Sequence, residues 1–106
     1  MLLARVIGTV VSTQKDEAMK GRKLLLLRPL VVDESNQLRP AGNTVVAVDT
    51  LGAGEGETVL FCTGSSARQA SGMQTLPVDA VITGIVDSVD LAKGTIYPEA
   101  AKKKSK

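Results

Sequence analysis

The sequence lacks histidine and tryptophan, and Phe61 and Tyr97 are its only aromatic residues. Without histidine, the chain cannot supply the usual base for a nucleophilic serine or the most common nitrogen ligand for a metal ion. The single cysteine, Cys62, excludes an intrachain disulfide and cannot form a zinc site of paired thiolates. We therefore expect a buried, inert thiol at Cys62 and no metal site.

Long apolar runs are also absent. Spanning a bilayer takes about 18 or more consecutive apolar residues, whereas the apolar stretch from Met1 to Val11 is shorter and is interrupted by Arg5. Nor does this stretch have the basic start, apolar middle and small-residue cleavage site of a signal peptide. We expect a soluble, cytoplasmic chain with no membrane partner.

The excess of basic charge is confined to the end of the chain. There are 13 Lys and Arg residues against 11 Asp and Glu residues, but four of the lysines are among the last five residues. Outside residues 100–106, nine basic residues face eleven acidic ones. A domain that binds single-stranded nucleic acid needs a basic groove with stacking aromatic residues. Binding of single-stranded nucleic acid is the main alternative function that we consider, but this composition argues against a nucleic-acid partner.

Apolar stretches rich in β-branched residues predict an all-β domain. No segment keeps a helical period over ten residues, so we expect at most one short helix, at 66–70. Glycines within two of the strands, Gly8 and Gly84, indicate bulges or bends, which small barrels use to close. We predict a five-stranded OB-like β-barrel in residues 1–92, followed by a flexible, lysine-rich tail in 93–106. The predicted strands are Leu2–Thr13, Lys23–Val32, Thr44–Asp49, Thr58–Thr63 and Val78–Val89.

A glycine-rich loop separates the third and fourth predicted strands. Gly52, Gly54 and Gly56 form a G-x-G-x-G pattern, which lacks the third glycine of the dinucleotide-binding fingerprint and the lysine of a P-loop. A strand follows it instead of a helix, and Glu55 and Glu57 would repel a phosphate. Two interpretations remain, a hairpin loop between antiparallel strands and a loop that contacts another chain.

Acidic and hydroxyl side chains beside the strands have ordinary structural explanations. The carboxylates of Asp49, Asp79, Asp87 and Asp90 could act in acid–base chemistry, but their positions at strand ends equally suit backbone caps or ion pairs between subunits. Ser65 and Ser66 fit a turn or a helix cap better than a nucleophile, because no base is identifiable.

Several segments together resemble the EutN/CcmL family, the pentameric vertex proteins of bacterial microcompartment shells. The matching segments are Ala4–Val11, Lys23–Leu30, Val46–Glu57, Gly64–Arg68 and Pro77–Asp87. The resemblance implies an OB-like barrel that assembles as a cyclic pentamer and closes the five-fold corners of a shell, where sheets of hexameric shell proteins meet. It implies a structural role, with no catalytic residues and no cofactor.

Crowding around a ring's axis gives the glycine loop a second explanation. Glycine removes the side chain where backbones converge, so we expect the loop near the five-fold axis, with Glu55 or Glu57 close to the opening. The residues predicted at the axis are Gly52, Ala53, Gly54, Glu55, Gly56 and Glu57. Those predicted at subunit contacts, from charges within or beside apolar strands and from the matching segments, are Arg5, Arg28, Asp49, Ser65, Ser66 and Arg68.

Overall fold

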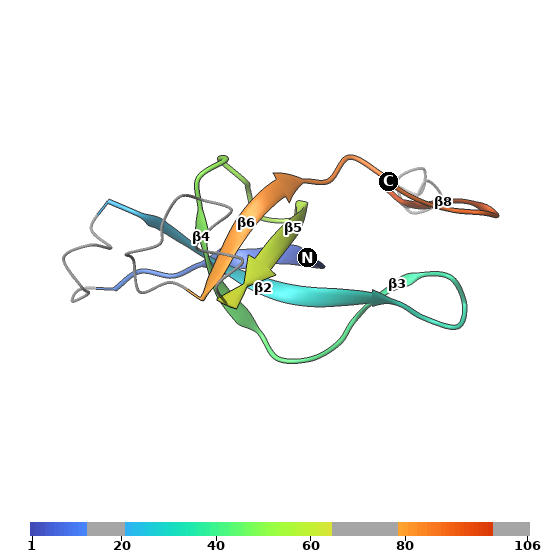
Figure 1. Ribbon diagram of the computed structural model, residues 1–106, viewed down its shortest axis with the longest axis horizontal. Helices are drawn as coiled ribbons and strands as arrows, with labels where there is room; N and C mark the ends of the chain where they lie inside the picture. The colour runs from blue at the N-terminus through green and yellow to red at the C-terminus, as the bar shows by residue number, and fades with distance from the viewer. Residues whose placement is uncertain (13–20, 65–78, 99–106) are drawn as a thin grey trace.

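The computed structural model describes residues 1–12, 21–64 and 79–98. Within these residues the chain forms eight β-strands (Figure 1). In chain order they are β1 (Leu2–Thr9), β2 (Lys23–Val32), β3 (Leu38–Pro40), β4 (Val45–Asp49), β5 (Thr58–Thr63), β6 (Ala80–Ile85), β7 (Val89–Leu91) and β8 (Gly94–Tyr97).

Five of these strands close into the predicted OB-like barrel. Around the barrel the order is β1-β5-β6-β4-β2, and β2 pairs again with β1 to complete the circle. The pairing of β4 with β6 is parallel, and the other pairings of the barrel are antiparallel. β3 extends the far end of β2 outside this circle.

The position of β6 corrects one interpretation of the glycine loop. β4 and β5 follow each other along the chain, but they are not neighbours in the sheet. β6 lies between them and pairs with both. Residues 50–57 therefore do not form a hairpin loop, because they must cross from one side of β6 to the other. This crossing explains why the loop is longer than a hairpin needs.

The predicted strand limits are partly right. Those of β2 and β5 are confirmed, whereas β1 ends at Thr9 and the last predicted strand is divided between β6 and β7. β3 and β8 were not predicted. The β7–β8 hairpin crosses residue 92, where we expected the barrel domain to give way to the tail. The predicted helical turn at 66–70 lies outside the described residues.

Both predicted bulges are present. The register between β1 and β2 shifts between Val6 and Gly8. The register between β5 and β6 shifts where Leu60 pairs with Gly84 and Phe61 with Ile82. An extra residue in one strand bends it and increases its twist, which helps so short a sheet to close on itself.

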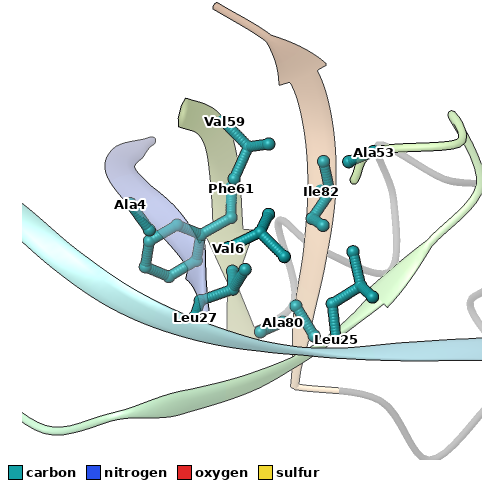
Figure 2. Packing of buried hydrophobic residues seen from close by; sticks show 10 residues of the cluster. Ala4, Val6, Leu25, Leu27, Ala53, Val59, Phe61, Ala80 and Ile82 are labelled. Atoms are coloured by element: carbon teal, nitrogen blue, oxygen red, sulfur yellow. The ribbon is translucent and has the colours of Figure 1, made fainter. Parts of the chain in front are cut away.

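The inward side chains of the barrel strands form a narrow core, together with Ala53 from the glycine loop (Figure 2). Ala4 and Val6, two residues apart on β1, are fully buried. Strand alternation puts Leu2 on the same face, but Leu2 is 53% exposed because it is the first residue of the strand. The core cluster is Ala4, Val6, Leu25, Leu27, Ala47, Ala53, Val59, Phe61, Ala80 and Ile82.

Asp49, the last residue of β4, fixes the first half of the crossing loop. Its Oδ1 and Oδ2 accept hydrogen bonds from the backbone N–H groups of Leu51 and Ala53, both at 2.9 Å. The Lys23 ammonium lies 3.8 Å from Oδ2 and donates to the Ala53 carbonyl at 3.3 Å. Because the Asp49 side chain has 0% exposure, the predicted subunit contact by Asp49 is not supported.

We predict that Asp49→Ala destabilises the subunit. The substitution removes the acceptor of two backbone N–H groups, and leaving buried polar groups unsatisfied costs about 1–3 kcal/mol. Urea unfolding should show this loss, whereas Glu34→Ala, which removes an exposed carboxylate, should leave the midpoint unchanged. Equal midpoints for the two variants would contradict the anchoring role of Asp49.

Candidate assembly site

The second half of the glycine loop is tied to β1. The N–H of Gly56 donates to the Val6 carbonyl at 2.8 Å, and the N–H of Val6 donates to the Glu57 carbonyl at 2.9 Å. The Glu57 carboxylate in turn accepts a hydrogen bond from the N–H of Gly54 at 2.6 Å. With Asp49 holding its start, the loop is fixed at both ends, and it presents the exposed Glu55 at its tip.

The three glycines of this loop have different reasons to be glycine. Gly52 and Gly56 have φ values of 84° and 89°, a left-handed conformation that other residues adopt only at a cost. Gly54 has no such φ, and a Cβ placed there would meet only the Glu57 Oε1, at an ordinary contact distance of 3.6 Å. The subunit itself therefore does not require glycine at position 54.

Arg5 and Arg28, both predicted at subunit contacts, lie directly opposite each other. They are register partners in the antiparallel pairing of β1 with β2. Arg28 is exposed and Arg5 is half-buried, and within the described residues neither forms an ion pair. Like charges facing each other across a sheet are destabilising. The pair therefore favours an anionic partner from outside the described part of the subunit.

Ser65, Ser66 and Arg68 lie outside the described residues. Cys62 is buried and free, as predicted. Within the described residues, no three His, Cys, Asp or Glu side chains gather as metal ligands could. In the same part of the chain, no helix is long and apolar enough to cross a membrane.

The two aromatic residues do not form a surface on which bases could stack. Phe61 is 1% exposed and belongs to the core inside the barrel (Figure 2). Tyr97 lies on β8, in the separate hairpin beyond the barrel (Figure 1). Stacking side chains on the barrel wall are what a single-stranded nucleic-acid site needs, so the structure gives no support to that alternative.

Sequence reasoning missed three features of this surface. One is Lys23, whose ammonium group supports the Asp49 anchor. Another is the β7–β8 hairpin, whose signal was Gly94 between two short apolar segments. The third is an outward groove with a volume of about 510 Å³. Leu3, Leu60, Ile85 and residues 86–89 line this groove, which only the folded barrel brings together.

Comparison with known proteins agrees with this geometry over nearly the whole chain. A family profile described as "Ethanolamine utilisation protein EutN/carboxysome" matches residues 1–87. The bacterial microcompartment shell vertex protein GrpN of Rhodospirillum rubrum is 50% identical over 90 residues, which cover 85% of this chain and 97% of GrpN. The carboxysome shell vertex protein CcmL of Gloeobacter violaceus is 47% identical over 97 residues, covering 92% of this chain and 93% of CcmL.

Solved structures give the same result. The Gloeobacter violaceus CcmL structure aligns with a TM-score of 0.78 at 46% identity, covering 93% of this chain and 98% of that one. The structure of GrpN, described as a pentameric microcompartment shell protein, aligns with a TM-score of 0.73 at 48% identity, covering 86% and 99% of the two chains. From its barrel, its glycine loop and these matches, the chain belongs to the EutN/CcmL family of microcompartment shell vertex proteins.

Proposed function

We propose that five copies of this chain form a ring that occupies the five-fold corners of a bacterial microcompartment shell. The observation that carries this proposal is the match of the closed barrel, over most of its length, to the pentameric shell protein GrpN. The chain is a structural shell vertex protein, located with its shell in the cytoplasm. Its role is geometric, and we assign it no catalytic residue and no cofactor.

The partners that we propose for this ring are hexameric shell proteins. A sheet of six-fold units lies flat, and it can close into a polyhedron only if five-fold units occupy the corners. A ring of identical subunits is held by heterologous contacts, in which one surface of each copy meets a different surface of the next. The subunit therefore needs two complementary contact surfaces and an inner edge that tolerates crowding.

We place the loop from Gly52 to Glu57 at that inner edge. Support comes from Gly54, where the subunit's own backbone and packing leave room for a side chain. Close approach of a neighbouring copy supplies a reason for glycine at this position. Five Glu55 carboxylates then face the water-filled opening, where the repulsion between like charges is much weaker than in a buried site.

We place Arg5 and Arg28 at the contact between adjacent copies, where carboxylates of the neighbour offset their mutual repulsion. Their position on the outward face of β1 and β2 supports this proposal. The proposed contacts also retain Ser65, Ser66 and Arg68 from the sequence. Asp49 is not included, because its carboxylate is used inside the subunit.

Native mass spectrometry and shell reconstitution test the proposed function. The purified protein should give the mass of five subunits at micromolar concentration. Co-expression with a hexamer-forming shell protein should give closed particles, and omission of this chain should leave open sheets or particles without corners. A monomer as the main species, or closed particles that form equally well without the chain, would overturn the proposal.

Substitutions at Gly54 and Gly52 should separate assembly from folding. Gly54→Val adds a side chain where only another copy would meet it, so the ring should weaken while the subunit stays folded. Gly52→Ala forces a left-handed conformation on alanine, which should destabilise folding by about 1–2 kcal/mol. Sedimentation velocity measures the first effect and circular dichroism during urea unfolding measures the second. A Gly54→Val protein with an unchanged ring would contradict the placement of the loop.

Removing the arginine pair should weaken the ring in a salt-dependent way. For wild type, raising the salt concentration should promote dissociation, because ions screen partly exposed charge pairs. An Arg5→Ala, Arg28→Ala double variant should dissociate at higher protein concentration and respond less to salt. Arg22→Ala, at another exposed arginine, is the control and should behave as wild type. If the double variant matches this control, these arginines make no subunit contact.

A further inference from the structure

A row of apolar residues crosses the outward face of β1, β2 and β4. Gly8 on β1 is the register partner of Leu26 on β2, and Leu26 is in turn the register partner of Val46 on β4. The residues on either side of Leu26, which are Leu25 and Leu27, point into the barrel (Figure 2). Strand alternation therefore directs the row to the outside. We refer to Gly8, Leu26 and Val46 as the outer row.

The described part of the subunit leaves the outer row partly uncovered. Val46 is 47% exposed and Leu26 is half-buried. Val48, two residues further along β4, faces the same way but is only 2% exposed, so the subunit covers this face beyond the row. A single exposed valine is ordinary. Here, however, the exposed valine continues into a half-buried leucine and a glycine, which together form a small apolar surface.

Gly8 has no reason to be glycine within the described part of the subunit. Its φ lies outside the left-handed region, and a Cβ placed there would meet no described atom within 4 Å. The bulge beside it does not require glycine either, because only a bulge with a left-handed φ does so. Glycine inside a strand weakens that strand, and it often marks a place where another backbone approaches closely. Close approach of another chain would explain this glycine.

The outer row lies directly beside the Arg5–Arg28 pair. Leu26 and Arg28 are two residues apart on the outward face of β2, and Arg28 is the register partner of Arg5. Exposed ion pairs alone contribute little to the stability of a contact, so the contact that we propose for these arginines needs an apolar part. The outer row supplies that part. Together they have the apolar centre and charged border that are typical of subunit interfaces.

The apolar surface on the other side of the arginine pair is less available. Leu3 lies two residues from Arg5 on the same face of β1, but residues 86–89 of the same chain line the groove around it. The outer row lies instead on the side of β4, where Val46 is three residues before Asp49 and the start of the glycine loop. Because we place this loop at the inner edge of the ring, the outer row lies where adjacent copies converge.

We propose that an adjacent copy of this chain packs on the outer row, with one of its residues seated over Gly8 and against Leu26 and Val46. This inference rests on the proposed ring, which places a second copy beside the arginine pair. It assigns the apolar centre of the contact to β1, β2 and β4, with the arginines at its border. The contact is heterologous, so every subunit of the ring offers one outer row and covers that of the next.

A charge in the outer row should weaken the ring without unfolding the subunit. We expect Val46→Asp to raise the protein concentration at which half of the rings dissociate by at least about tenfold, because it buries a carboxylate in an apolar contact. Val31→Asp is the control, since Val31 is similarly exposed, at 41%, on the part of β2 that pairs with β3. It should leave that concentration unchanged. Two variants that dissociate alike would overturn the proposal.

Substitutions at Gly8 should affect folding and assembly in different ways. Alanine limits the freedom of the unfolded chain where the native backbone suits it, so Gly8→Ala should leave the urea midpoint of the dissociated subunit unchanged or raise it. The same substitution should weaken the ring, and Gly8→Val should weaken it further, because each side chain fills space that the neighbour occupies. Sedimentation velocity measures the ring. A Gly8→Val ring as stable as that of wild type would contradict the proposed contact.

Photo-crosslinking identifies the occupant of the outer row. A small diazirine side chain at position 46 should, on irradiation, join two subunits of this chain, as denaturing gels would show. Crosslinks only within one subunit, or only to a hexameric shell protein in assembled shells, would overturn this inference and leave the vertex function standing. A monomeric wild-type protein would instead contradict the vertex function, and this inference with it.

Discussion

The crossing from β4 to β5 is the constraint on which the rest of the structure depends. Because β6 lies between these strands, the chain must pass over the end of the barrel in a loop that is not a hairpin. The buried Asp49 carboxylate holds the start of this loop, and backbone hydrogen bonds from Gly56 to Val6 and from Val6 to Glu57 hold its end. The barrel closes beneath it, with Ala53 filling the core.

This anchored loop links the subunit to its assembly. Its backbone explains two of its three glycines, and the third remains without a reason inside the subunit. The Arg5–Arg28 pair shows the same incompleteness, since two positive charges face each other without a counter-charge among the described residues. Both features destabilise or weaken an isolated subunit, and both gain a physical explanation in a ring of copies.

Much of the barrel could be predicted from local sequence. The apolar stretch from Lys23 to Val32 and the buried strand from Thr58 to Thr63 have the observed limits, and Gly8 and Gly84 marked the two bulges. The order of the strands could not be predicted in this way, because inserting β6 between β4 and β5 depends on contacts distant in sequence. The hydrogen bonds of Asp49 within the subunit were not foreseen for the same reason.

The sequence singled out residues of the candidate site by their type, but it did not reveal the role of each one. Glycine spacing drew attention to the loop, but only the φ angles separate Gly54 from Gly52 and Gly56. A charge within an apolar strand singled out Arg5 and Arg28, but only the strand register places them opposite each other. The short strands of the β7–β8 hairpin gave too weak a pattern to be recognised. The groove lined by Leu3, Leu60 and Ile85 exists only after folding, because its residues come from different strands.

Cryo-electron microscopy of the purified protein would test the central claim most directly. The account predicts a five-fold ring in which Glu55 is nearer to the axis than either Arg5 or Arg28. A ring with the loop from Gly52 to Glu57 on its outer rim, or particles without five-fold symmetry, would contradict it.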